Sequence, residues 1–319
     1  MEHPEPQALD ELLERAWAGV EPSPEAAEQL IQSDPATPVL ESLGLRPDAC
    51  ERLRMFRAVS GLPPETHLDA AGFEVAARVS PAELWRFYLP LCRFIRTLCG
   101  QAEGRTVVGI AGCGASGKSV FAGLLQAILN RTGPSTARAA LFPLDGYHYP
   151  NAYLAEHFTT DEDGRRVSLR AIKGAPETFN ARAYVEDLRS VHTESRVRLP
   201  RYDRNLHDPV PDAMAIGPAD QIVLTEGNYL LLDRGPWAKV RPLLDLAVFV
   251  FLPRRVIRRL MIERHMRGGK SRPAAVRKYE DSDRSNARLI ASTMPRADLA
   301  VRRSADQRVE ALERIESTG

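Results

Sequence analysis

The stretch Gly112-Cys113-Gly114-Ala115-Ser116-Gly117-Lys118-Ser119 decides the fold, because it matches the pattern G-x-x-x-x-G-K-[ST]. It follows an apolar run at 106–111 and precedes a helical pattern at 120–130, which is the strand–loop–helix context that this pattern requires. In such a loop the glycines let backbone N–H groups surround phosphates, and the start of the helix adds partial positive charge. The sequence therefore predicts a phosphate-binding loop between a strand and a helix.

The loop predicts that the chain binds a nucleoside triphosphate, with ATP and Mg²⁺ as the expected cofactors. Lys118 would neutralise the terminal phosphates and Ser119 would ligate the metal. The alternative is an ordinary glycine turn. The chain lacks the guanine-reading pattern N-K-x-D and the L-S-G-G-Q signature of ABC ATPases, which favours a small-molecule kinase. The residues expected to contact the nucleotide are Gly112, Cys113, Gly114, Ala115, Ser116, Gly117, Lys118, Ser119 and Val120.

Strand-length apolar runs alternate with helical patterns from residue 106 onward. Continuous apolar strands separated by helices are typical of a parallel sheet covered on both faces. The predicted fold class is therefore α/β, a P-loop-type parallel sheet sandwiched by helices, with ligands at the carboxyl ends of the strands. The expected strands are 106–111, 139–144, 221–225, 246–252 and, with a weaker pattern, 298–301, and the expected helices are 120–130, 181–192 and 253–266.

The first 78 residues read differently, as short helices interrupted by proline and without an alternating strand pattern. We expect helices at 8–20 and 47–60, and hence an all-helical N-terminal extension at 1–78 followed by a P-loop domain at 79–319. The second part opens with Ser80-Pro81-Ala82-Glu83. A serine N-cap, a proline in the first turn and a glutamate three residues after the serine predict a helix start there.

The overall composition limits the class of protein. The 319 residues carry 43 basic and 42 acidic side chains, with 44% hydrophobic residues, which excludes disorder for most of the chain and argues against a dedicated nucleic-acid binder. The longest apolar run, 246–252, has the length of a strand and not of a membrane helix. No secretory signal is visible, and the four cysteines lack metal-finger or disulfide-framework spacing. The expectation is a cytoplasmic protein without a membrane or nucleic-acid partner.

Two acidic residues follow predicted strands at the edge where the phosphate loop lies. Asp145 ends the second strand, and a carboxylate there can orient an attacking hydroxyl or accept its proton. Glu226 ends the third strand, at the position where an acid holds Mg²⁺ or its waters. The alternatives are an N-cap or Asx-turn aspartate and a loop acid near solvent.

Four further stretches carry a family resemblance over about three quarters of the chain. They are Pro143-Leu144-Asp145-Gly146-Tyr147-His148-Tyr149-Pro150-Asn151, Lys173-Gly174-Ala175-Pro176-Glu177-Thr178-Phe179-Asn180, Tyr202-Asp203-Arg204-Asn205-Leu206-His207-Asp208-Pro209-Val210 and Glu226-Gly227-Asn228-Tyr229-Leu230-Leu231-Leu232. With the phosphate loop, they resemble the P-loop kinases that include type I pantothenate kinase, uridine kinase and phosphoribulokinase, and are most similar to the YggC-like branch. The resemblance implies that Asp145 is the base, that Glu226 serves the metal, and that Tyr147, Lys173 and Asn286 lie on the acceptor side. For Asn286, an asparagine on a helix surface is the alternative.

The third stretch departs from both kinase patterns that it resembles. Tyr202 and His207 match the acceptor-binding element of uridine kinases, whereas pantothenate kinase has a histidine where this chain has Arg204 and a tyrosine where it has His207. Uridine kinases also carry a basic residue where this chain has Asp208. From the residues themselves, Tyr202, Arg204 and His207 suit a hydroxylated small acceptor, either neutral or anionic. A structural turn with a hydrogen-bonded histidine is the alternative.

The segment from Arg254 to Lys270 is dense in arginine and ends at Gly268-Gly269, which predicts a helical lid with a hinge. A lid arginine can stabilise the charge that spreads over the transferred phosphoryl group. We expect Arg264 first and Arg259 second in that role. A solvated basic helix face is the alternative for either residue.

Taken together, the sequence predicts an ATP-dependent kinase that acts on the hydroxyl of a small metabolite. A nucleotide-binding regulator with the kinase fold is the second hypothesis, and an ATP-dependent nucleic-acid protein is a weaker third. Related kinases are often dimers, so a homodimer is one expected state, although nothing in the sequence sets the oligomeric state.

Overall fold

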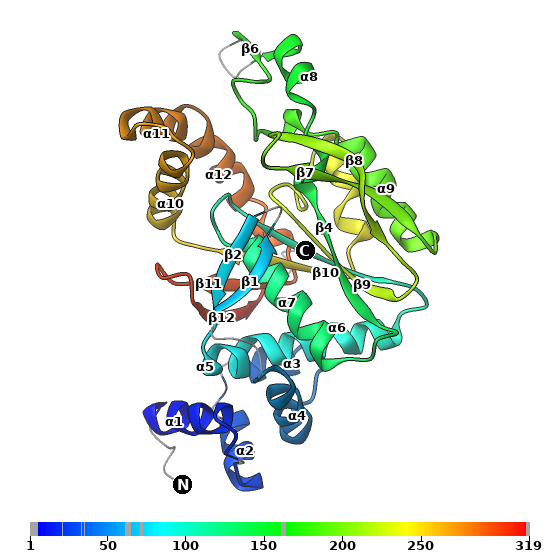
Figure 1. Ribbon diagram of the computed structural model, residues 1–319, viewed down its shortest axis with the longest axis vertical. Helices are drawn as coiled ribbons and strands as arrows, with labels where there is room; N and C mark the ends of the chain where they lie inside the picture. The colour runs from blue at the N-terminus through cyan, green and yellow to red at the C-terminus, as the bar shows by residue number, and fades with distance from the viewer. Residues whose placement is uncertain are drawn as a thin grey trace.

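A six-stranded sheet forms the centre of the computed structural model, which describes residues 6–316 apart from 21, 33, 35, 61–64, 71, 72 and 161–163 (Figure 1). The strand order is β12-β11-β10-β3-β9-β4, and all neighbours pair in parallel except β11 and β12. The predicted parallel sheet is therefore confirmed, with β12 as an added antiparallel edge. The strands are β3 (Thr106–Gly112), β4 (Arg138–Pro143), β9 (Asp220–Gly227), β10 (Leu246–Phe251), β11 (Leu299–Arg303) and β12 (Val309–Arg314).

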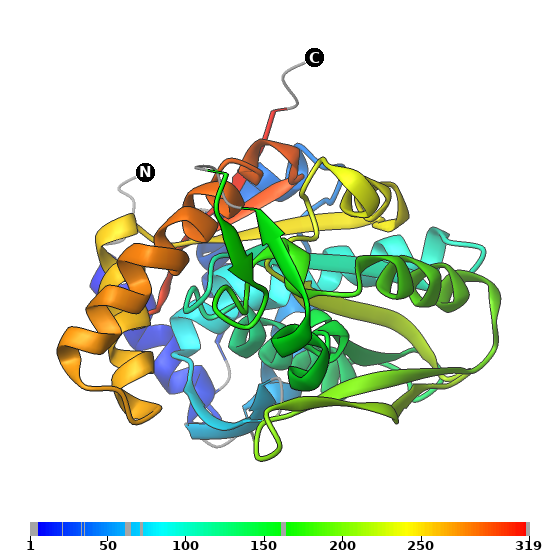
Figure 2. The same ribbon diagram turned by 90° about the horizontal axis from the view of Figure 1, so that it is seen from above.

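Helices cover both faces of this sheet, as the continuous apolar strands predict. Along β3, Val108 and Ile110 enter one core with α6 (Leu89–Gln101) and α7 (Lys118–Thr132). Val107 and Ala111 enter the other core, with α9 (Ala181–Thr193) and α12 (Arg284–Ala291). The view from above shows the helices on the two sides of the strands (Figure 2). Every residue of β3 is buried, which explains why this strand reads as an unbroken apolar run.

The N-terminal extension is not entirely helical. Four helices are present, namely α1 (Pro6–Trp17), α2 (Pro24–Gln32), α3 (Thr37–Glu41) and α4 (Ala49–Val59), and the two that were expected lie at α1 and α4. They are followed by an antiparallel pair, β1 (Glu65–Ala70) and β2 (Phe73–Arg78). The prediction of a purely helical extension is therefore wrong for these two strands. Their runs are short and mixed in polarity, so periodicity does not reveal them. The first five residues lie outside the described part.

The extension packs against the P-loop part as a continuous core. Leu13, Phe56 and Val59 are buried in the same hydrophobic cluster as α6 and α7. The ring of Phe56 lies edge-on to Trp85, with 5.6 Å between the ring centroids. Asp10 forms an ion pair with Arg86 at 2.8 Å. In Figure 1 these helices lie at the end of the molecule that also holds α5 and α6.

The helix predicted at Ser80 begins as expected. Ser80 and Glu83 form a reciprocal capping box at α5 (Pro81–Glu83), which continues through the π-helical turn η1 (Leu84–Tyr88) into α6. Within the described residues, no helix has the length and apolar character that crossing a bilayer needs.

The remaining elements follow the strands of the central sheet. The basic segment forms α10 (Arg254–Arg267) and α11 (Arg272–Lys278), with the predicted break between them. The π-helical turn η6 (Tyr279–Asp283) then leads into α12. The other elements are η2 (Leu144–Tyr147), α8 (Asn151–Glu156), β5 (Phe158–Thr160), β6 (Arg166–Ser168), η3 (Pro176–Thr178), β7 (Val197–Asp203), β8 (Asp208–Ile216), η4 (Gly235–Lys239), η5 (Arg241–Leu243) and η7 (Met294–Arg296).

Candidate active site

The phosphate loop joins β3 to α7 in the conformation that its sequence requires. Ala115 and Gly117 have left-handed backbones, with φ of 62° and 82°. A Cβ atom on Gly112 would lie 2.7 Å from both Ser116 Oγ and the carbonyl oxygen of Val250. Gly117 is the N-cap residue of α7 and has no side chain that could accept a hydrogen bond from the helix. The first N–H groups of α7 are therefore suited to bind a phosphate.

Cys113 within the loop is a buried thiol. Its Sγ donates to the carbonyl oxygen of Ala287 in α12 at 3.4 Å. Burial raises the pKa of Cys113 to about 11, although Lys118 opposes the rise. The thiol is therefore protonated at neutral pH and links the loop to α12.

A buried arginine supports the loop from behind. Arg303, at the end of β11, is 5% exposed, and its Nη1 donates to the carbonyl oxygen of Ser116 at 3.0 Å. Its Nη2 donates to the carbonyl oxygen of Gln307. The same guanidinium lies against Gly117, where an added Cβ would be 1.6 Å from Nη1. No motif in the sequence marks Arg303, because it reaches the loop from a distant strand.

Lys118, Ser119 and Glu226 come together at the start of α7. Ser119 Oγ donates to Glu226 Oε1 at 2.9 Å, and Lys118 Nζ lies 3.5 Å from Glu226 Oε2. Glu226 is 4% exposed. Burial raises its pKa above the usual range and the Asp145 carboxylate adds to the rise, although Lys118 and Ser119 oppose it.

This group of side chains fits Mg²⁺ by its chemistry. A hydroxyl and a carboxylate oxygen are hard donors, and Mg²⁺ in such sites usually takes one or two protein oxygens together with water and substrate phosphates. No cluster of three or more His, Cys, Asp or Glu side chains suited to a metal occurs among the residues that the structure describes. Ser119 and Glu226 are thus the donors that would hold the ion beside a bound triphosphate.

Asp145 lies in η2, directly after β4, and forms an ion pair with Arg204. Its side chain is 27% exposed. Burial alone would raise the pKa of Asp145, but Arg204 and, to a lesser degree, His148, Lys118 and Arg264 outweigh it and hold the pKa below the usual range. The carboxylate is therefore ionised at neutral pH and close to the lysine of the phosphate loop.

Two of the predicted acceptor residues, Lys173 and Arg204, lie over the ring of a third, Tyr202. The Tyr202 ring has Lys173 Nζ at 5.3 Å and the Arg204 guanidinium at 4.9 Å from its centroid. The hydroxyl of Tyr202 donates to the carbonyl oxygen of His207 at 2.8 Å, and Lys173 Nζ donates to the same oxygen at 3.0 Å. Asn151 Nδ2 is a third donor to it, at 2.9 Å. His207 thus acts here through its backbone, in a turn with φ of 54°.

Tyr147 and His148 follow Asp145 and are both largely buried. Tyr147 is 3% exposed and its hydroxyl donates to Asp187, so its side chain packs in the core, and its acceptor role stays a prediction. His148, which was not a candidate, stacks on Phe179 with ring centroids 3.9 Å apart. Burial lowers the pKa of His148 to about 4, although Asp145 opposes the fall. The imidazole of His148 is therefore neutral at pH 7. In the sequence, the only sign of a role for His148 is its position three residues after Asp145.

The remaining candidate residues lie in α10 and α12. Arg264 is exposed in the last turn of α10 and close enough to Asp145 and Tyr202 for its positive charge to favour the ionised form of each. Arg259 Nη2 instead donates to the carbonyl oxygen of Ala305 at 3.1 Å. Asn286 is half-buried in α12, next to the carbonyl that contacts Cys113. The catalytic and acceptor roles of these three residues stay predictions.

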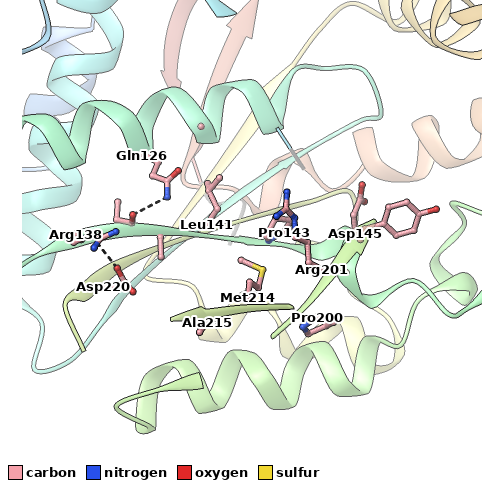
Figure 3. A pocket seen from close by; sticks show the side chains of 15 residues that line it. Gln126, Arg138, Leu141, Pro143, Asp145, Pro200, Arg201, Met214, Ala215 and Asp220 are labelled. Carbon is pink, nitrogen blue, oxygen red and sulfur yellow. Dashed lines mark hydrogen bonds and ion pairs between the residues drawn. The ribbon is translucent and has the colours of Figure 1, made fainter. Parts of the chain in front are cut away.

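A pocket of about 350 Å³ runs along the outer edge of β4, between α7 and the β7–β8 pair. Figure 3 shows Asp145 at one end of this pocket and Arg138 with Asp220 at the other. The volume suits a small ligand. Lys118, Lys173 and Arg204 do not line it, so only its Asp145–Tyr202 end belongs to the candidate site.

A parallel sheet, a phosphate loop after β3, and acids at the ends of β4 and β9 define a P-loop fold of the small-molecule kinase type. The match to a family model supports this class. The model of the phosphoribulokinase / uridine kinase family matches residues 107–310, and the chain belongs to that family.

Individual relatives agree with this membership. The chain is 31% identical over 235 residues to the uncharacterized protein YggC of Escherichia coli strain K12, a match that covers 73% of this chain and 93% of YggC. It is 31% identical to a pantothenate kinase of Corynebacterium glutamicum, over 60% of this chain and 62% of the relative. A solved structure from Silicibacter, described as a "putative fructose transport system kinase", superimposes with a TM-score of 0.56 at 28% identity and covers 63% of this chain and 92% of that one. These kinase relatives support an ATP-dependent small-molecule kinase.

Proposed function

We propose that the protein is an ATP-dependent kinase that transfers the γ-phosphate of ATP to a hydroxyl of a small metabolite, such as a sugar, a nucleoside or a pantothenate-like alcohol. One observation carries the proposal. Asp145 follows β4 two residues after Pro143, which pairs with Glu226 of β9, and Glu226 lies 3.5 Å from Lys118. Lys118 lowers the pKa of Asp145, so an acceptor base candidate and a phosphate-binding group share one site.

In the proposed reaction the acceptor oxygen forms a bond to the γ-phosphorus, the bond from that phosphorus to the β,γ-bridging oxygen breaks, and ADP leaves. Asp145 orients the hydroxyl and receives its proton, which then passes to water. An aspartate with a lowered pKa is a weak base, but phosphoryl transfer through a loose transition state needs positioning more than proton removal.

The remaining groups would hold the phosphates. Lys118 and the N–H groups of the loop neutralise and align the triphosphate. A Mg²⁺ ion held by Ser119 and Glu226 would neutralise charge on the β- and γ-phosphates. Arg264, on the lid, is the candidate for charge that develops on the transferred group.

The test is incubation with Mg²⁺-ATP and a panel of sugars, sugar acids, nucleosides and pantothenate-like alcohols, with product detected by mass. We expect a phosphorylated acceptor with the wild-type protein and none with Lys118→Ala, because that lysine binds the phosphates. ATP-dependent capture of a partner protein, with no phosphorylated member of the panel, would instead favour the regulator.

A further inference from the structure

Arg204 forms an ion pair with Asp145, and this pair occupies the carboxylate that an acceptor hydroxyl would need. The Arg204 side chain is 18% exposed and lies beside the ring of Tyr202. A guanidinium in this position does not merely neutralise Asp145. It also presents a planar set of N–H donors next to the reacting hydroxyl, a geometry that matches carboxylates and phosphates.

A second cation, Lys173, lies over the same ring of Tyr202. Lys173 Nζ is 5.3 Å from the Tyr202 ring centroid and is held by Asn151 Oδ1 at 2.8 Å and by the carbonyl oxygen of His207 at 3.0 Å. Both of these partners are neutral. The ammonium is half-buried, and burial lowers its pKa, with Arg204 and Arg170 adding to the fall and Asp208 opposing it.

Positive charge therefore exceeds negative charge around the acceptor position. Among the described residues, the cations that act on Asp145 or Lys173 include Lys118, Arg170, Arg204 and Arg264, and the acids that act with them are Asp145, Asp208 and Glu226. His148 adds no charge at neutral pH, because burial lowers its pKa to about 4. Interactions between charges are stronger where water is excluded, so an anionic group on the acceptor would be favoured there over a neutral one.

We propose that Arg204 and Lys173 bind an anionic group of the acceptor, a carboxylate or a phosphate, so that the substrate is an acidic alcohol. The anion takes over Arg204 from Asp145, and the released carboxylate oxygen accepts the hydroxyl of the same molecule. Arg204 is thus a specificity-determining residue for acidic acceptors. The role of the released Asp145 carboxylate rests on the proposed kinase function. The binding of an anion by Arg204 and Lys173 does not depend on that function.

The test uses matched series of neutral and acidic probes: pantothenol with pantothenate, glucose with gluconate and glucose 6-phosphate, and ribose with ribonate and ribose 5-phosphate. Binding is measured by calorimetry in the presence of a non-hydrolysable ATP analogue, and turnover is measured with Mg²⁺-ATP. We expect at least one acid to bind tenfold or more tightly than its neutral partner and to have the higher kcat/KM. Comparison of the carboxylate probes with the phosphate probes shows which of the two anionic groups the site binds.

Three variants test which residues cause the preference for acidic over neutral probes. Arg204→Gln should remove the tenfold preference, Arg204→Lys should retain part of it, and Lys173→Met should weaken it, all with unchanged ATP affinity. Arg198→Gln is the matched control, because Arg198 is exposed near the start of β7, the strand that precedes Arg204, and pairs with Ala215 far from the turn. It should leave the preference intact.

Two results would overturn the inference: no acid in any series binding more tightly than its neutral partner, or a preference that survives in Arg204→Gln. The proposed function fails in a different way. An Arg204-dependent preference in binding, with no phosphorylated product from any probe, would support the anion site and reject the kinase reaction.

Discussion

Arg303 shows how a single residue can shape the nucleotide site from outside it. Its guanidinium is buried below the phosphate loop and fixes the carbonyl of Ser116, the residue between the left-handed positions Ala115 and Gly117. Burial lowers the pKa of Arg303, although Tyr88 and Glu83 oppose the fall. The hydrogen bond to Ser116 therefore holds the backbone of the loop at the turn between these two positions.

Replacing this residue gives the first prediction. Arg303→Met leaves the Ser116 carbonyl without its donor, which costs about 1–3 kcal/mol for a buried acceptor, so the Kd for ATP should rise by about tenfold. Calorimetric titration with ATP measures this change. Arg302→Met is the control, because Arg302 is exposed and pairs with Glu313. Equal ATP affinity in both variants would contradict the role of Arg303.

Among single residues, the sequence predicts best those that a motif places at the ends of strands. Lys118, Ser119 and Glu226 are within hydrogen-bonding or ion-pair distance because parallel strands end at one edge of the sheet. Arg303 and Tyr147 were not predictable in the same way. The contact of Arg303 with Ser116 spans 187 positions, and the direction of the Tyr147 side chain depends on the geometry of η2.

Among the elements, the β7–β8 pair positions the acceptor residues relative to the sheet. The pair approaches η2 so closely that a Cβ on Gly146 would lie 2.4 Å from the carbonyl oxygen of Pro200 in β7. Tyr202 and Arg204 follow at the end of the same strand. The approach at Gly146 therefore sets how near these two side chains come to Asp145.

Gly146→Ala tests this contact. The added methyl meets backbone atoms, which cannot move alone, so β7 must shift. We expect a loss of about 1–3 kcal/mol in the free energy of unfolding, and a rise in the KM for the acceptor that exceeds the change for ATP. Gly100→Ala in α6 is the control, since nothing lies within 4 Å of its added Cβ, and alanine favours a helix. Similar stability of the two variants in urea would contradict the account.

The sequence predicts the elements of the central sheet better than the peripheral ones. β3 and β10 are buried along nearly all of their length, and β9 is buried from Ile222 to Gly227, so each contains an apolar run. β8, in contrast, is exposed or half-buried except at its last residue and contains two prolines, so its pairing with β7 depends on tertiary context. The same reason applies to β1, β2 and β12, which the patterns did not indicate.

For the whole molecule, the structure joins the N-terminal helices to the P-loop part through one hydrophobic core. Leu13, Phe56 and Val59 are each fully buried in that core. Arg131 of α7 donates to the carbonyl oxygen of Ala58, and Arg314 of β12 donates to that of Ser42. The boundary at residue 78 stays a prediction about sequence organisation, and this packing predicts that the two parts unfold together.

Removal of residues 1–60 should therefore destabilise the rest. The lost burial of Leu13, Phe56 and Val59 alone corresponds to about 5 kcal/mol, which is a large part of the stability of a typical domain. Thermal unfolding followed by circular dichroism should show a lower Tm or loss of the cooperative transition. A truncated protein that is soluble and unfolds cooperatively at the wild-type Tm would show that the extension is an independent unit.

The most direct test of the central claim compares the wild-type protein with Asp145→Asn in the phosphorylation assay on the acceptor that the panel identifies. The amide keeps the shape of the side chain but removes the charge that orients the hydroxyl and receives its proton. We predict a fall of at least about hundredfold in the rate of product formation, with the Kd for ATP unchanged because the phosphate loop is intact. Product formation at a near wild-type rate would contradict the account, because Asp145 would then not be the residue that serves the acceptor.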